Sequence, residues 1–200
     1  MENLKLLLVC FGLFLGSPIY AQIADKAENV APLLIGEQIP DATLLNAKGE
    51  KVQLDMLLSQ KPTVLIFYRG GWCPFCSVHL AEIAKIEKDI LQAGYQIIAI
   101  SPDDYQNLQN TAETGKLAYQ VFSDAKGELL QAIGIAFRSP DKVKEYIASK
   151  TKGKVSDIMP VPSLMIVDKK RTILFEYISP DYKKRISSKL LMAVLENINI

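Results

Sequence analysis

The chain has 200 residues, of which 49% are hydrophobic and 22% are charged, and its formal net charge is +1. This length fits one domain with extensions, and the apolar content with a near-zero charge excludes a largely disordered chain. The 23 basic residues are balanced by 22 acidic ones, so we expect no nucleic-acid partner. Three cysteines and one histidine are the scarce reactive side chains.

The N-terminal segment has the pattern of a secretory signal peptide. Lys5 precedes an apolar run over residues 6–15, and Ala21 is a small residue at the expected cleavage position. The run is shorter than the roughly 20 residues that span a bilayer, so we expect no stable membrane anchor. A lipoprotein would use Cys10 as its lipid acceptor, but Cys10 lies in the middle of the apolar run. We therefore predict cleavage after Ala21 and export to the periplasm or another extracytoplasmic compartment.

Cleavage of residues 1–21 would leave a mature chain with a lead-in segment over 22–35 and one domain over 36–200. Its only cysteines would be Cys73 and Cys76. Exported proteins meet an oxidising compartment, so we expect these two thiols to form or exchange a disulfide.

The first half of the mature chain shows strand and helix patterns in alternation. Two short β-rich runs over 42–45 and 52–54 predict a hairpin. The apolar run 63–68 predicts a buried strand, the spacing of apolar residues predicts a helix over 74–93, and 95–100 predicts a second buried strand.

The second half adds shorter elements. In chain order, we predict a polar helix over 103–114, a strand over 119–122, a helix over 125–133, a hairpin over 163–167 and 172–178, and a helix over 183–196. Residues 134–159 are polar and lysine-rich and predict no element. The whole order predicts an α/β fold with a mixed central sheet flanked by helices and an N-terminal hairpin extension.

The chemical centre is the sequence Trp72-Cys73-Pro74-Phe75-Cys76, between the first buried strand and the long helix. Cys73 is predicted to cap the helix, with Pro74 at the first helical position. The unpaired N–H groups and the dipole of a helix start favour a thiolate, which is the nucleophilic form of cysteine. Cys76, one turn later, can then resolve a covalent intermediate on Cys73.

Other interpretations of this CxxC sequence are weaker. A structural disulfide closing so small a loop would add only about 2 kcal/mol. Zinc needs four ligands and only His79 could join the cysteines, while haem attachment needs a histidine where Ser77 stands. We therefore predict redox exchange with no metal and no cofactor. We interpret His79 as a packing residue and Trp72 as a lid over the disulfide.

Three motifs carry a resemblance to a known family: residues 67–76, Ser101-Pro102-Asp103, and Pro160-Val161-Pro162-Ser163. With them the chain resembles the peroxiredoxin-like branch of the alkyl hydroperoxide reductase/thiol-specific antioxidant (AhpC/TSA) family, within the thioredoxin superfamily. The resemblance implies a thioredoxin-like fold and a cis peptide bond between Val161 and Pro162. It also implies that these two residues bind the substrate beside Trp72.

The chain departs from its relatives at several family positions. Arg69 stands where the family's loop has a proline, and Cys73 stands where it has a threonine. Cys76, by contrast, stands at the family's peroxidatic cysteine position. The arginine that the family carries on a late strand is missing, and Phe67 replaces the buried carboxylate of thioredoxins.

Three functions are compatible with these observations. In a thiol peroxidase, either Cys76 (by family position) or Cys73 (by its place at the helix start) attacks peroxide, and the other thiol closes the disulfide. In a thiol–disulfide oxidoreductase, Cys73 attacks a disulfide of an exported protein. The third is a binding module with an inert disulfide. Both enzymes would need an external dithiol protein as their partner, recognised in an apolar groove beside Trp72 and Pro162.

Overall fold

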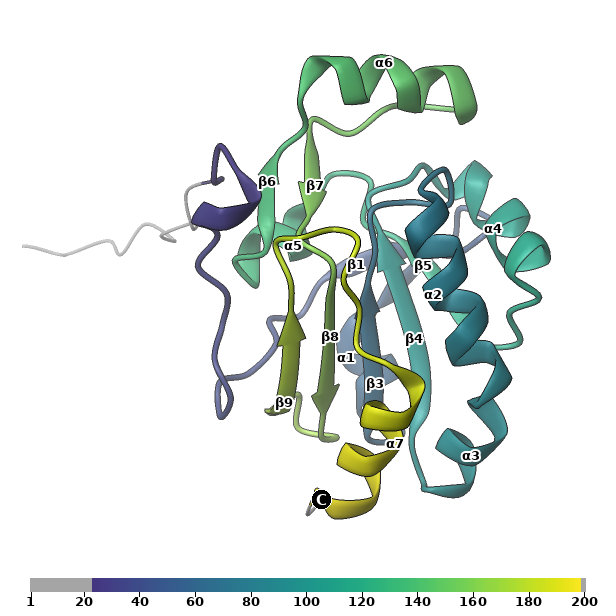
Figure 1. Cartoon of the computed structure of the whole chain (residues 1–200), viewed down its shortest axis with the longest axis vertical. Helices are drawn as coiled ribbons and strands as arrows, with labels where there is room; N and C mark the ends of the chain where they lie inside the picture. The colour runs from purple at the N-terminus through teal and green to yellow at the C-terminus, as the bar shows by residue number, and fades with distance from the viewer. Residues whose placement is uncertain (1–22, 199–200) are drawn as a thin grey trace, which may run out of the picture.

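The computed structural model describes residues 23–198, and the predicted signal peptide lies outside them. A seven-stranded central sheet has the order β2-β1-β5-β4-β3-β8-β9 (Figure 1). Its strands are β1 (Thr43–Leu45), β2 (Lys51–Gln53), β3 (Thr63–Phe67), β4 (Gln96–Ser101), β5 (Gln120–Ser123), β8 (Ser163–Val167) and β9 (Ile173–Ile178). A small second sheet pairs β6 (Ala136–Arg138) with β7 (Ile158–Pro160).

The sheet is mixed because β3 is parallel to β4 and antiparallel to β8. Strand β4 is also parallel to β5, and the β1–β2 hairpin joins the sheet through the pairing of Leu45 with Ser123. All five residues of β3 are buried, as its unbroken apolar sequence predicts for a central strand.

Nine helical segments connect the strands in the described part of the chain. They are the 3₁₀ helices η1 (Ala27–Asn29) and η2 (Tyr105–Asn107), and the α-helices α1 (Leu54–Leu58), α2 (Pro74–Lys85), α3 (Glu87–Gln92), α4 (Leu108–Gly115), α5 (Glu128–Ala132), α6 (Asp141–Lys150) and α7 (Ser188–Asn197).

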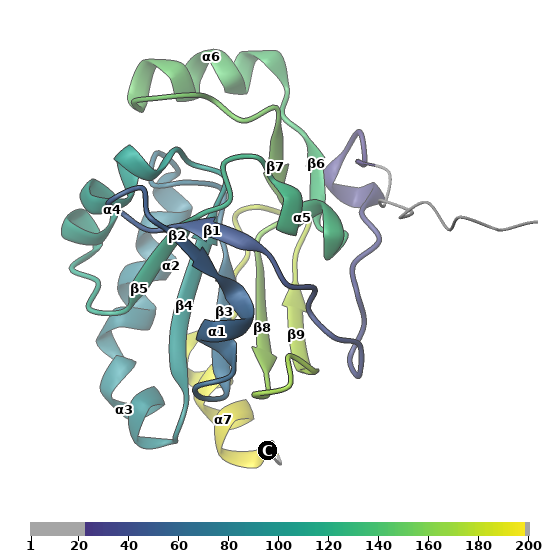
Figure 2. The ribbon, with the colours of Figure 1, turned by 180° about the vertical axis from the view of Figure 1, so that it is seen from behind.

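Helices cover both faces of the sheet, which confirms the predicted α/β architecture. Alternate residues of β3 point to opposite faces, so Val64 and Ile66 enter one core while Leu65 and Phe67 enter the other. The first core is covered by α2, α3, α4 and α7. The second is covered by α1 and α5, which Figure 2 shows from behind.

Several predicted helices differ from the observed ones. The helix expected over 103–114 is the 3₁₀ helix η2 followed by α4, and the one expected over 125–133 is the shorter α5. The helix expected over 74–93 is interrupted at Ile86, whose φ of −107° and ψ of 10° separate α2 from α3. The C-terminal helix begins only at Ser188, because Ser187 caps it by accepting a hydrogen bond from the Leu190 N–H. The preceding residues are therefore a loop.

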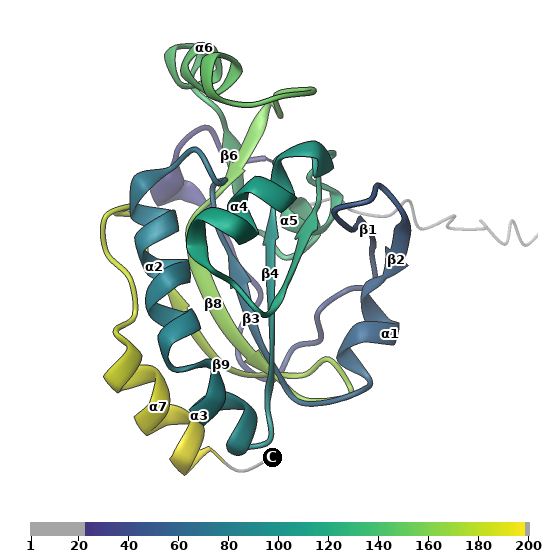
Figure 3. The same cartoon turned by 90° about the vertical axis from the view of Figure 1, so that its right-hand side faces the viewer.

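The segment without predicted structure forms β6, α6 and β7, so the sequence interpretation missed three elements there. In α6 only Ile147 is buried, and a helix with so small an apolar face leaves little periodic signal. Figure 3 shows α6 standing off the end of the central sheet, and Figure 1 shows the β6–β7 pair beneath it. In residues 23–198 no helix is long and apolar enough to span a membrane.

Candidate active site

The loop after β3 brings the CxxC sequence to one end of the sheet. Gly70 has a φ of +148°, and a Cβ there would meet the Trp72 indole nitrogen and lie 2.6 Å from Asp103 Oδ1. A Cβ on Gly71 would meet the Thr111 hydroxyl of α4. Only glycines allow the loop to pass this close to its neighbours before helix α2 begins.

Cys73 and Cys76 occupy the positions expected from the sequence. Cys73 is the N-cap of α2 with an extended backbone, Pro74 is the first helical residue, and Cys76 lies in the first turn. Both are free thiols, and their exposed fractions are 1% and 0%. Both sulfurs are therefore shielded from water.

The two thiols have opposite acidities. A hydrogen bond from the Cys76 thiol, helped by the charges of Arg69 and Arg185, lowers the pKa of Cys73 to about 6 although burial opposes it. Burial, and then the hydrogen bond and the negative charge of Cys73, raise the pKa of Cys76 well above its usual value. Near neutral pH this assigns the thiolate to Cys73 and the protonated thiol to Cys76.

An arginine that the sequence analysis missed lies against the dithiol. Nη2 of Arg185 donates a hydrogen bond to the Cys76 sulfur at 3.5 Å. Its Nη1 donates to the carbonyls of Tyr182 and Lys184, the latter at 2.8 Å. The local backbone thus holds the guanidinium in place. Arg185 is 109 residues from Cys76 in the chain, in the loop before α7, so no local motif points to it.

Aromatic and cationic side chains surround the dithiol. The guanidinium of Arg69 lies 5.0 Å from the centre of the Trp72 ring and 4.6 Å from that of Tyr182. Tyr182 also meets Phe75 edge to face at 5.6 Å, and Trp72 meets Tyr146 of α6 at 6.1 Å. Trp72 is therefore held between Arg69 and α6, and its role as a lid over the sulfurs stays a prediction.

The predicted cis bond before Pro162 is wrong, because every peptide bond in residues 23–198 is trans. Val161 is fully buried, and its N–H donates to the Ile135 carbonyl at 2.8 Å. Ile135 immediately precedes β6, so the partner comes from the connection between α5 and β6. The Val161 N–H is thus already used within the chain and is not free for a substrate backbone.

His79 is buried one turn after Cys76, with a 5% exposed fraction, in agreement with its interpretation as a packing residue. Burial lowers its pKa to about 4, and the nearby charge of Arg185 adds to the effect. Its Nε2 has no hydrogen-bond partner in the structure. The imidazole is therefore neutral at physiological pH.

An apolar cavity of about 330 Å³ adjoins the site. It is lined by Arg69, Met159, Pro162, Tyr182 and residues of η1, β6 and α6, so the predicted groove includes Pro162 but not Trp72.

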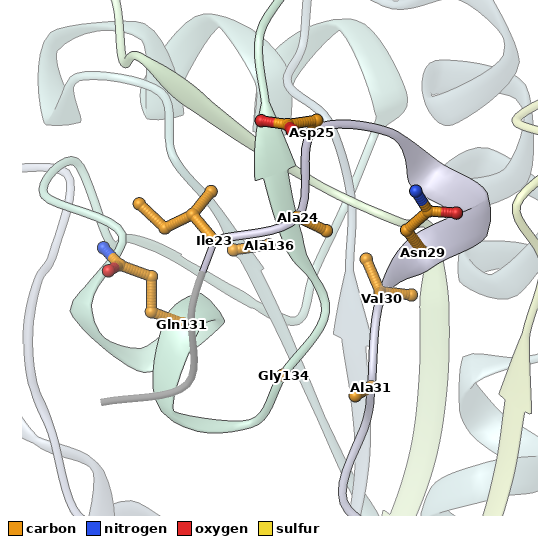
Figure 4. Close-up of a pocket in the computed structure, with 9 residues that line it drawn as sticks. All are labelled: Ile23, Ala24, Asp25, Asn29, Val30, Ala31, Gln131, Gly134 and Ala136. Atoms are coloured by element: carbon orange, nitrogen blue, oxygen red, sulfur yellow. The ribbon is translucent and has the colours of Figure 1, made fainter. Parts of the chain in front are cut away.

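A larger cavity of about 510 Å³ lies between residues 23–31 and the α5–β6 connection (Figure 4), and neither cysteine lines it. Within residues 23–198, no group of three His, Cys, Asp or Glu side chains could hold a metal ion.

Comparisons with known proteins agree with this geometry. The model of the AhpC/TSA family matches residues 35–175. Peroxiredoxin bcp1 of Schizosaccharomyces pombe is 24% identical over 157 residues, which cover 76% of this chain and 80% of that protein.

Two solved structures share the fold. Peroxidoxin BcpB from Mycobacterium tuberculosis has a TM-score of 0.64 and 22% identity, and the match covers 83% of this chain and 98% of that one. Reduced Prx3 from Vibrio vulnificus has a TM-score of 0.70 and 16% identity, with 82% and 99% covered. The chain therefore belongs to the AhpC/TSA family and has the thioredoxin-like fold and the oxidoreductase class of the peroxiredoxins.

Proposed function

We propose that the protein is a thiol peroxidase in which Cys73 attacks the peroxide and Cys76 resolves the product to a disulfide. The observation that carries this assignment is the opposite acidity of the two thiols, with a lowered pKa at Cys73 and a raised one at Cys76. The family position favours Cys76 as the attacking residue. We assign Cys73 because the thiolate is the form that reacts with peroxides.

The reaction needs only the two sulfurs and an external reductant. The Cys73 thiolate attacks one peroxide oxygen, the O–O bond breaks, and the second oxygen leaves with a proton as water or an alcohol. Cys73 is then a sulfenic acid. The Cys76 thiol attacks its sulfur, the S–O bond breaks, and water leaves as the Cys73–Cys76 disulfide forms. A dithiol protein of the thioredoxin type then reduces the disulfide and is itself oxidised.

Arg185 and Arg69 supply positive charge where the late-strand arginine of the family is missing. Arg185 bonds the Cys76 sulfur, and both guanidinium groups stabilise negative charge on Cys73. During attack, negative charge grows on the departing oxygen, and fixed cations beside a shielded site stabilise it.

The burial of both sulfurs favours a small substrate over a protein disulfide. A protein disulfide must bring its own sulfur into contact with Cys73, whose exposed fraction is 1%. The backbone N–H of Val161 is also already bonded to Ile135. A peroxide needs neither a wide opening nor a free backbone edge.

The test compares two substrates at equal concentration. The reduced protein is mixed with hydrogen peroxide or with insulin, and disulfide formation between Cys73 and Cys76 is followed by mass spectrometry. We expect fast oxidation by peroxide, one molecule consumed per disulfide formed, and slow reaction with insulin. The double variant Cys73→Ser/Cys76→Ser is the control for reaction elsewhere. Fast exchange with insulin and peroxide consumption no faster than that of free cysteine would instead support the oxidoreductase.

We also propose that residues 1–21 are a cleaved signal peptide and that the enzyme works outside the cytoplasm. The support is the sequence pattern of Lys5, the apolar run 6–15 and Ala21. Expression of the full chain followed by cell fractionation and mass measurement tests this. A periplasmic species that begins at Gln22 is expected, and a full-length cytoplasmic species would contradict it.

A further inference from the structure

We propose that Asp103 is a positioning residue for the dithiol: its carboxylate holds Gly71 and Trp72 against the end of β4 and so fixes Cys73 at the start of α2. Asp103 belongs to the Ser101-Pro102-Asp103 motif, which has no part in the chemistry described above. The inference rests on the proposed function only in naming Cys73 as the residue whose placement matters.

The carboxylate accepts hydrogen bonds from both residues that precede Cys73. Oδ2 accepts from the Gly71 N–H at 2.8 Å, and the Trp72 indole N–H donates to the same carboxylate. Asp103 Oδ1 and the indole nitrogen also crowd the same side of Gly70. Two fixed donors thus tie the loop to a single side chain.

The sheet holds Asp103 itself. It lies two residues after the end of β4, has an exposed fraction of 6%, and its carbonyl accepts a hydrogen bond from the Ser123 hydroxyl at the end of β5. The path from the sheet through Asp103 to the loop is therefore continuous. Because Cys73 follows Trp72 directly, movement of the Trp72 indole would move the attacking sulfur.

The ionisation of Asp103 controls how many of these hydrogen bonds form. A carboxylate accepts from both N–H donors, whereas protonation converts one oxygen into a hydroxyl donor. Burial raises the pKa of Asp103 to about 6, and the charges of Cys73 and Asp104 add to this. Tyr68 faces it from the end of β3, and Arg69 and Lys154 line the adjoining small cavity. We expect the clamp to be complete above pH 7 and weakened below pH 5.

Trp72 is the only tryptophan of the chain, so its fluorescence reports on the clamp directly. The experiment uses the full chain with Cys73→Ser and Cys76→Ser, which removes thiolate quenching. The emission maximum and acrylamide quenching are measured from pH 4.5 to 8. We expect a red shift and stronger quenching at low pH. The midpoint should lie at or slightly below 6, because the Cys73 charge that raises the Asp103 pKa is absent.

Three substitutions separate positioning from general stability. Asp103→Asn should remove the pH dependence of the Trp72 fluorescence and keep the low-pH emission at every pH. The reason is that the amide of asparagine presents N–H groups to one of the two donors, the Gly71 N–H or the Trp72 indole N–H. Asp103→Glu, which keeps the charge, should retain a titration with a shifted midpoint and serves if the Asn variant fails to fold. Asp104→Asn is the matched control, because the side chain of this neighbouring acid accepts hydrogen bonds from the Gln106 and Lys154 N–H groups and none from Gly71 or Trp72. It should keep the titration, with a slightly lower midpoint because the Asp104 charge raises the pKa of Asp103.

A peroxide assay with both cysteines present completes the test. At pH 8 the single-turnover rate should fall about tenfold in Asp103→Asn, because a misplaced nucleophile loses its alignment, and Asp104→Asn should leave it unchanged. Tryptophan emission that is flat with pH, or a titration that survives in Asp103→Asn, would overturn the proposal. If instead the proposed peroxidase function is wrong, every variant reacts slowly with peroxide while the fluorescence titration still distinguishes them.

Discussion

Replacing Cys76 by alanine tests the origin of the Cys73 acidity. The hydrogen bond from Cys76 is the largest influence that lowers the pKa of Cys73 from 9.0 to about 6. A hydrogen bond to a charged group contributes about 1.5–3 kcal/mol, which corresponds to about one to two pKa units. In Cys76→Ala we therefore expect the pKa of Cys73 to rise to roughly 7–8.

The assay is the pH dependence of iodoacetamide alkylation at Cys73, which follows the thiolate fraction. At pH 7 that fraction should fall from about 90% to roughly 10–50%, so alkylation should slow by roughly two- to tenfold. Cys76→Ser is the matched control, because its hydroxyl still donates a hydrogen bond to Cys73. An alkylation midpoint that stays near 6 in Cys76→Ala would refute the reasoning and assign the acidity to the helix start and the arginines.

Three further predictions concern charge, pH and packing. Arg185→Met should slow oxidation by peroxide about tenfold, because the Arg185 charge lowers the pKa of Cys73 and a fixed cation stabilises the negative charge that grows during attack. Arg185→Lys should restore part of the rate, and equal rates in stopped-flow measurements would exclude a role for this charge. Burial raises the pKa of Asp124 from 3.8 to about 7, so its contribution to stability is complete below pH 4 and is lost as pH rises through 7. Between pH 5 and 8 the free energy of unfolding, measured with urea, should fall by about 1–3 kcal/mol less in Asp124→Asn than in the parent protein. Parallel pH profiles of the two proteins would contradict this. Leu80→Ala should lower the free energy of unfolding by about 2–5 kcal/mol because Leu80 is a buried residue of α2. Leu91→Ala, at a residue 48% exposed, should lower it by under about 0.5 kcal/mol, and similar losses at both positions would be evidence against the packing described.

Local sequence patterns predicted the elements that local forces determine. The apolar run 63–68 is β3 because a central strand is buried on both faces. Cys73 and Pro74 begin α2 because an extended N-cap followed by proline suits a helix start. The missed α6 has one buried residue, so its periodicity is weak.

The parts of the site that the sequence did not predict come from contacts between distant residues. Arg185 reaches Cys76 across 109 residues of chain, and Asp103 reaches Gly71 across 32. Thioredoxins have a carboxylate at the position of Phe67 and the family has an arginine on a late strand, and this chain has neither. In the structure the Arg185 guanidinium reaches the dithiol from the loop before α7, and the Asp103 carboxylate reaches the loop before Cys73 from the end of β4.

The central claim is that Cys73 attacks peroxide and Cys76 resolves. The most direct measurement treats Cys73→Ser and Cys76→Ser with hydrogen peroxide at pH 7 and traps sulfenic acid with a dimedone-type reagent for mass spectrometry. The account predicts rapid labelling of Cys73 in Cys76→Ser and slow labelling of Cys76 in Cys73→Ser. Rapid labelling of Cys76 with an unreactive Cys73 would contradict it and return the attacking role to the family position.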